Sequence, residues 1–230
     1  MIALIADEPR WVEIRSLMLS GRAHVEVAST SPPALVVVRP DIAQGGVIGR
    51  PPHAIIRMMA ERADEMLVEP EHVEWVAAAL PEWEFESATL HLLGAAPRLP
   101  LVSPGLVRAV SREELASWPD IPEDLRQELV AVDPDTPVFA AFARDQPVAF
   151  CYAGAVTERL WDLSIDTLEP FRRQGYATQC AAYVIERMRA VGKEPVWGAM
   201  ASNIASARLA VKLGFVPVDT IFVFEKPRSR

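Results

Sequence analysis

The stretch from residue 159 to residue 192 constrains the fold more than any other, because its apolar period changes once, from that of a strand to that of a helix. Residues 159–168, RLWDLSIDTL, alternate apolar and polar side chains as a half-buried strand does. Residues 172–192, RRQGYATQCAAYVIERMRAVG, have apolar residues spaced for one helix face and a glycine placed to end the helix. The face consists of Tyr176, Cys180, Val184 and Met188. We therefore expect a strand that leads into a long helix at the glycine of RRQG.

Further elements surround this stretch in a clear order. We expect helical residues at 112–132, two strands of a hairpin at 136–143 and 147–156, a strand at 195–200, a helix at 202–214 and a strand at 215–224. A short strand at 107–110 precedes them. The second half of the chain is thus predicted to be α/β or α+β, with a strand-rich sheet and two late helices.

The first half has a similar mixture of elements, and a proline- and glycine-rich segment divides it from the second. Helices are expected at 9–20, 52–63 and 70–80, and strands at 24–29, 34–38 and 88–93. Residues 94–105, GAAPRLPLVSPG, interrupt the pattern. We predict a smaller α/β domain at 1–100 and a second domain at 106–230. Residues 45–52, GGVIGRPP, match no phosphate-binding glycine pattern and are expected to form a loop.

Composition argues against several classes of function. The formal net charge of -8 disfavours general nucleic-acid binding and would tolerate cationic substrates. No basic leader precedes the acidic start, and no apolar run approaches the length of a membrane span, so neither export nor membrane insertion is expected. Cys151 and Cys180 lie in apolar patterns typical of buried, reduced thiols, which favours the cytoplasm. The four histidines lack metal-site spacing, so no metal is expected.

The join between the strand and the long helix is a candidate anion site. A helix start presents backbone N–H groups without acceptors and a partial positive charge, which suit a phosphate or pyrophosphate. Gly175 would let a ligand approach the backbone closely, and Arg172 and Arg173 add positive charge. An ordinary helix start with solvated arginines is the alternative reading of this stretch taken alone.

Two motifs in the second half together resemble those of the GNAT superfamily of N-acetyltransferases. The segment IDTLEPFRRQGYA matches the signature [Q/R]-x-x-G-x-[G/A] at Arg172, Gly175 and Ala177. About thirty residues later, NIASARLAVKLGF matches N-x-x-[A/S]-x-x-L-x-x-K-x-G-F. The matching positions of this second motif are Asn203, Ser206, Leu209, Lys212, Gly214 and Phe215. The resemblance covers residues 107–230 and implies a GNAT-like sheet flanked by helices, while residues 1–100 are of unassigned type or a degenerate copy of the same fold.

The resemblance also implies a set of site residues for acetyl-coenzyme A. The N–H groups of residues 173–177 would hold the pyrophosphate, the backbone of residues 165–167 would pair with the pantetheine arm, and Asn203 would contact the pantetheine or acetyl end. Written out, the implied cofactor residues are Ile165, Asp166, Thr167, Arg172, Arg173, Gln174, Gly175, Tyr176, Ala177 and Asn203. For Asn203, capping of the following helix is an alternative role.

Acetyl transfer to an amine requires a base and a way for the sulfur to depart. The strand before the anion site offers Asp162 and Asp166 as the general base, acting directly or through a water. The resemblance implies Asp162 first, because it lies close to where some GNAT proteins have a catalytic carboxylate. Ala210 stands where many GNAT proteins have a tyrosine that protonates the sulfur, and Tyr152 is a candidate substitute. A thiol can also leave as thiolate.

The leading hypothesis is therefore a cytoplasmic, acetyl-CoA-dependent N-acetyltransferase that acts on an amine by direct attack on the thioester. The acceptor would be a small-molecule or peptide amine, and a homodimer is one possible assembly. A non-catalytic acyl-CoA sensor is the rival hypothesis, favoured by Ala210. Transfer of a longer acyl group is also left open, because the sequence does not define the acyl pocket.

Overall fold

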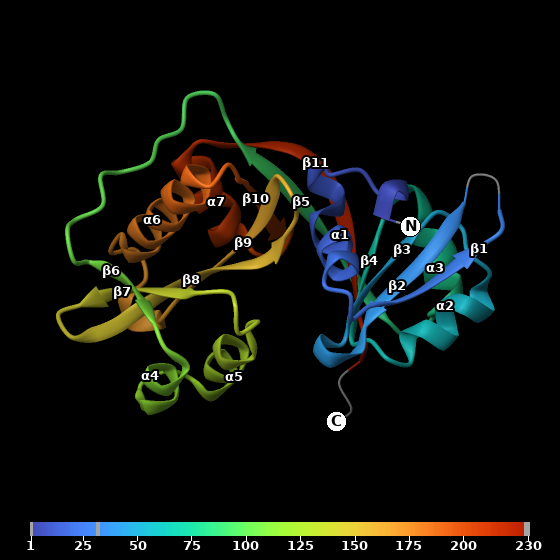
Figure 1. Ribbon diagram of the computed structural model, residues 1–230, viewed down its shortest axis with the longest axis horizontal. Coiled ribbons are helices and arrows are strands. Elements are labelled where there is room, and N and C mark those ends of the chain that lie inside the picture. Colours follow the sequence, from blue (N-terminus) through green and yellow to red (C-terminus); the bar gives the residue numbers. More distant parts are fainter. Residues whose placement is uncertain (1, 31–32, 228–230) are drawn as a thin grey trace. The chain divides into compact units, whose positions relative to one another are not determined.

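The computed structural model describes residues 2–30 and 33–227, which form two compact units that are interleaved in the sequence (Figure 1). The first unit contains residues 1–91, 198–207 and 217–230, and the second contains residues 92–197 and 208–216. The strands β5 (Glu84–Leu93), β10 (Glu194–Met200) and β11 (Phe215–Glu225) therefore contribute to both units. The predicted division into residues 1–100 and 106–230 remains a proposal.

The first unit combines short helices with an antiparallel meander. Its helical elements are η1 (Ile2–Leu4), η2 (Pro9–Trp11), α1 (Val12–Leu19), η3 (Pro40–Ile42), α2 (His53–Ala60), η4 (Pro70–His72) and α3 (Val73–Ala79). Strands β1 (His24–Ala28), β2 (Ala34–Arg39) and β3 (Gln44–Ile48) pair antiparallel in sequence order, and β4 (Glu65–Val68) pairs parallel with β3. β11 pairs antiparallel with β4.

The core of the first unit lies between this sheet and α2 and α3. Val36, Val38 and Val47 from the strands are fully buried, and so are Ile56 and Val76 from the two helices. The alternate strand residues and the one apolar stripe of each helix thus meet in a single cluster, as their periodicities require.

One sequence expectation for the first unit is wrong. Residues 45–48, expected to be part of a loop, lie in β3. Its glycines serve close packing, because a Cβ on Gly46 would lie 2.3 Å from Ile14 Cδ1 and one on Gly45 would lie 2.6 Å from Met66 Sδ. Of the three glycines at positions 45, 46 and 49, Gly49, just after β3, is the one with the left-handed conformation that favours glycine in a turn, with φ of +70°. The four-residue strand β4 was not expected, because it is too short to display an alternating pattern.

The second unit confirms the expected order of elements. Strands β6 (Val107–Val110), β7 (Val138–Ala143), β8 (Gln146–Val156) and β9 (Leu160–Thr167) pair antiparallel in sequence order, and β10 pairs parallel with β9. The helical elements are α4 (Arg112–Ser117), α5 (Glu123–Ala131), η5 (Glu169–Phe171), α6 (Tyr176–Ala190) and α7 (Ile204–Leu213), of which α7 spans the boundary between units. The fold is α/β with a mostly antiparallel sheet, as predicted.

Helices cover both faces of the second unit's sheet (Figure 1). Leu115 of α4 and Leu129 of α5 pack with Phe150 on one face. On the other face, Cys180 of α6 lies against the backbone of β7 and β8, with its Sγ 3.6 Å from the carbonyl oxygen of Phe139. α4 begins with a capping box between Ser111 and Glu114, which explains why the helix starts there.

The two halves of the chain repeat one order of elements. In each half a helix precedes three antiparallel strands, and a helix, a parallel strand, a helix and a last strand follow. The segment β3–α2–β4 of the first half thus corresponds to β9–α6–β10 of the second. No helix in the described part of the chain has the length and apolar character needed to cross a membrane.

Candidate functional site

The site begins at the loop between β9 and α6, whose backbone leaves several N–H groups available. Gly175 is the N-cap residue of α6 with φ of +93°, and Arg173 is also left-handed with φ of +61°. Gln179 N–H donates to the Gly175 carbonyl over 3.1 Å. The N–H groups of residues 175–178 have no acceptor among the residues that the structure describes. A Cβ on Gly175 would meet no atom within 4 Å, so the space in front of these donors is open.

A pocket of about 440 Å³ opens at this helix start. Its lining residues are Arg98, Pro100, Ser103, Leu106, Gln174, Gly175, Tyr176, Thr178, Gln179 and Lys212. They include two cations and no carboxylate, in a chain of net charge -8. Lys212 Nζ lies 3.4 Å from the Thr178 hydroxyl, within the first turn of α6. The cations and the helix start together make this pocket electropositive.

The side chains of the loop hold its turn in place. Arg172 Nε donates to the Thr167 carbonyl over 3.3 Å, and Gln174 Nε2 donates to the Pro170 carbonyl over 2.9 Å. Tyr176 packs edge-on against Phe171 with ring centroids 6.2 Å apart. These contacts fix the direction in which the following N–H groups point.

The segment between the two expected domains forms one wall of the pocket, which sequence reasoning missed. Gly94 N–H donates to the Gly214 carbonyl over 3.0 Å, and Arg98 N–H donates to the Leu213 carbonyl over 2.9 Å. Ser103 N–H donates to Gln179 Oε1 over 3.1 Å. The one signal in the sequence is Gly214, whose φ of +93° and lack of a Cβ allow the backbone of Arg98 to approach.

Strand β9 separates from β10 before it reaches the loop. The parallel ladder between them consists of three residue pairs, from Leu160 with Glu194 to Asp162 with Val196. Strand β9 continues to Thr167, paired on its other edge with β8. Ile165, Asp166 and Thr167 thus lie beyond the end of the β9–β10 ladder, and their predicted pairing with a ligand arm remains a proposal.

Both candidate bases lie on one face of β9. Asp162, Ser164 and Asp166 alternate along the strand and therefore point to the same side. Opposite them, β8 contains a bulge near Gly154, where an added Cβ would lie 3.2 Å from Asp162 Oδ2 and 3.0 Å from Ser164 Oγ. The bulge leaves room for these two side chains.

The two carboxyl groups differ in their surroundings. The pKa of Asp166 is raised to about 6, first by burial and second by the negative charge of Glu128, while Arg172 opposes this rise. Tyr152, on β8, donates its hydroxyl hydrogen to Glu128 Oε1 over 2.7 Å. Burial and this hydrogen bond raise the pKa of Tyr152 above its ordinary value, so the phenol stays protonated. Sequence reasoning named both aspartates but could not foresee the contribution of Glu128.

Ala210 lies on α7, the helix of the second motif, and Asn203 directly precedes this helix. Asn203 Oδ1 accepts the Ser206 N–H over 3.0 Å, so Asn203 caps α7. Asn203 belongs to the first unit and the α6 loop to the second, so its predicted contact with the coenzyme remains a proposal. Ala210 is fully buried, which explains why a small residue occupies this position.

Comparison with known families supports the assignment of the second half of the chain. Residues 139–224 match the model of the family described as GNAT acetyltransferase. These residues form a GNAT acetyltransferase domain. The match supports an acyltransferase and includes β9, the α6 loop, α6 and α7, so the candidate site lies largely within the GNAT domain. No curated protein sequence matches the chain.

Solved structures of similar fold extend over nearly the whole chain. A GCN5-related N-acetyltransferase-like protein from Streptococcus suis is 18% identical, with a TM-score of 0.69 over 91% of this chain and 92% of its own. A GNAT-family acetyltransferase from Novosphingobium aromaticivorans is 15% identical, with a TM-score of 0.62 over 96% and 100%. A tandem GNAT protein from the clavulanic acid biosynthesis pathway is 11% identical, with a TM-score of 0.54 over 94% and 89%. These likenesses show the fold, and the tandem protein agrees with the repeated order of elements.

Proposed function

We propose that the protein is an N-acetyltransferase that uses acetyl-CoA and acts on an amine by direct attack on the thioester. The main support is the pocket at the start of α6, which is lined by the cations Arg98 and Lys212 and by no carboxylate. Four N–H groups there have no acceptor within residues 2–30 and 33–227. Such a pocket suits the pyrophosphate of a coenzyme. When bound, acetyl-CoA would supply the acetyl group as a thioester.

Both backbone groups and side chains would take part in coenzyme binding. The N–H groups of residues 173–177 would hold the pyrophosphate, and the backbone of residues 165–167 would pair with the pantetheine arm. The side chains of Arg172 and Gln174 would support this indirectly, since both already bond carbonyl groups of the loop and of β9.

For the base, we retain Asp162 and Asp166 as candidates, and the surroundings favour Asp166. A general base is most effective when its pKa lies near the working pH, and the pKa of Asp166 is raised to about 6. Glu128 and Asp124 add negative charge near Asp166, which would attract an amine in its ammonium form. A cationic small molecule or a peptide amine is therefore the acceptor class that we propose.

A non-catalytic acyl-CoA sensor is the second candidate. The buried Ala210 favours it, because no hydroxyl group stands there to protonate a departing sulfur. Tyr152 is a poor substitute, since its hydroxyl hydrogen is already donated to Glu128.

Release of free thiol from acetyl-CoA, measured with a panel of mono- and polyamines, separates the two candidates. An enzyme releases thiol in proportion to added amine, and replacing the base by asparagine lowers turnover by on the order of 100-fold to 10,000-fold. Asp166→Asn and Asp162→Asn are measured side by side, so that the variant with the larger loss identifies the base. Tight acetyl-CoA binding without turnover for any amine would favour the sensor.

A further inference from the structure

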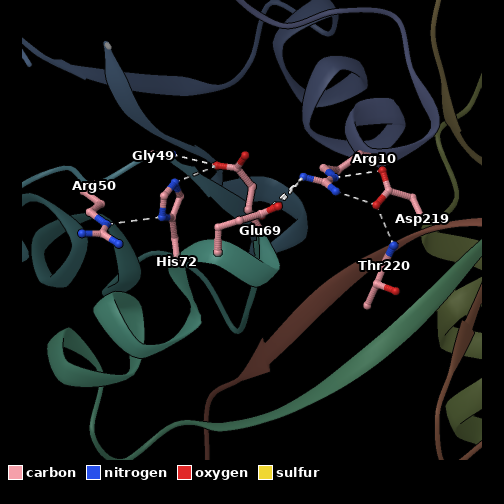
Figure 2. Close-up of polar contacts among 8 residues, drawn as sticks. Arg10, Gly49, Arg50, Glu69, His72, Asp219 and Thr220 are labelled. Carbon is pink, nitrogen blue, oxygen red and sulfur yellow. Dashed lines mark hydrogen bonds and ion pairs between the residues drawn. The ribbon is translucent and has the colours of Figure 1, made fainter. Parts of the chain in front are cut away.

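The first half of the chain has its own counterpart of the coenzyme loop, and the two loops differ in available donors. The counterpart is residues 49–52, which join β3 to α2. Pro51 and Pro52 have no N–H, and Pro52 is the N-cap residue of α2. The N–H of Gly49 is already donated to Glu69 Oε2 over 2.9 Å (Figure 2). Among the described residues, the N–H groups of Arg50, His53 and Ala54 have no acceptor, but the two prolines and the Gly49 bond leave no continuous row of four donors such as residues 175–178 provide.

Side chains from the segment after β4 contact this loop. Arg50 Nε donates to His72 Nδ1 over 3.5 Å, and His72 Nε2 lies 3.6 Å from the Glu69 carboxylate (Figure 2). Trp75 Nε1 donates to the Pro51 carbonyl over 2.9 Å. The Trp75 ring also lies 4.3 Å from the ring of His53, the first residue of α2. Side chains that follow β4 thus contact the loop that follows β3.

The parallel pairing of β3 with β4 also extends closer to its loop than the pairing of β9 with β10 does. All of β4 pairs with β3, from Glu65 with Gln44 to Val68 with Val47. The recorded ladder between β9 and β10 ends at Asp162, and β9 continues to Thr167. In the first unit, β3 and β4 therefore stay paired up to Val68, directly before Glu69.

We infer that the first unit is a copy of the GNAT fold whose coenzyme site is closed from within, with the Glu69 carboxylate in the place of a ligand anion. The chain then binds one acetyl-CoA, in the second unit. This inference rests on the proposed function for the coenzyme itself. It adds the number of coenzyme sites in the chain and the reason why the loop of residues 49–52 does not bind a coenzyme.

Titration of the full chain with acetyl-CoA by isothermal calorimetry tests the inference. Wild type should bind one equivalent, and Gly175→Glu should abolish binding. The matched change in the first loop, Arg50→Glu, should leave both the stoichiometry and the Kd within about twofold of wild type, because an exposed side chain away from the site has little influence on binding.

Other results of the titration would contradict either the inference about the first unit or the proposed function. Two equivalents for wild type, or binding that survives Gly175→Glu and is lost in Arg50→Glu, would show that the first unit has a working site and would overturn the inference alone. No binding to wild type would overturn the proposed function, and the inference with it.

Discussion

Among single residues, Asp166 has an electrostatic effect on stability that depends on pH. Its pKa is raised to about 6 by burial first and by Glu128 second. Because the folded pKa lies above the unfolded value, the favourable contribution is fully present below a pH of about 4 and is lost as the pH rises through about 6. At neutral pH the ionised side chain therefore destabilises the folded state.

We predict that Asp166→Asn raises the free energy of unfolding above pH 6 by up to ~3 kcal/mol. The gain should shrink as the pH falls toward 4, where the wild-type carboxyl group is protonated in the folded protein. Urea unfolding at several pH values measures it. A gain that is the same at every pH would show that Asp166 titrates normally.

Lys212 gives a second prediction at this scale, because it faces the first turn of α6 across the pocket. Lys212→Gln should weaken coenzyme A binding roughly tenfold, the size of one lost charge-assisted hydrogen bond. Arg208→Gln is the control, since Arg208 lies on the same helix, is exposed and does not line the pocket. Equal losses in both variants would mean that only net charge matters.

Single residues also mark the limit of what the sequence predicts. The helix start at Gly175 could be predicted because it depends on a local strand-to-helix join, while the coenzyme-binding roles of Gly175 and Arg172 remain proposals. The raised pKa of Asp166 could not be predicted, because it depends first on burial and second on Glu128, which lies 38 positions earlier in the chain on another element. Arg98 was missed because it follows a proline in a segment without any periodic pattern.

At the scale of elements, the order of strands and helices in the second half could be predicted because the elements are long and their periods distinct. The prediction for β3 was wrong because its glycines are needed for close packing against Ile14 and Met66, and no local sequence pattern shows this packing. The turn at Gly214 joins α7 to β11. Its carbonyl groups accept hydrogen bonds from residues 94 and 98, in the segment that lines one side of the pocket.

Gly214→Ala should therefore destabilise the protein more than Gly192→Ala. Both glycines are left-handed, with φ of +93° and +80°, so both variants have backbone strain on the order of 1 kcal/mol. Only at Gly214 would the added Cβ also lie 3.0 Å from the backbone nitrogen of Arg98. Chemical denaturation of the two variants measures the difference, and equal losses would mean that the segment moves aside freely.

At the scale of the whole molecule, the two units exchange parts of the chain. Residues 217–230 come last in the sequence but belong to the first unit, where β11 pairs with β4. Arg10 and Asp219 reinforce this through two hydrogen bonds of 2.9 and 2.6 Å (Figure 2). The predicted division into residues 1–100 and 106–230 rests on composition, which shows where a linker lies and not which strands pair.

We predict that residues 106–230 expressed alone do not unfold cooperatively. Phe224 is fully buried against residues of the first unit, and the fragment would expose it together with Ile221 and Val223. Circular dichroism during thermal unfolding tests this. A sharp transition in the isolated fragment, with coenzyme binding retained, would show instead that the second domain is autonomous.

The claim that α6 begins at a coenzyme site is tested most directly by the thermal shift that acetyl-CoA produces. At a free concentration 100 times the Kd, a ligand that binds only the folded state stabilises it by about 2.7 kcal/mol, so the melting temperature of wild type should rise. Gly175→Glu should abolish the rise, because a carboxylate would enter the anion position. Gly192→Glu, at the other end of α6, is the matched control, since both glycines are left-handed with no atom within 4 Å of an added Cβ. The account predicts a shift for wild type and Gly192→Glu only, and an equal shift in a folded Gly175→Glu variant would contradict it.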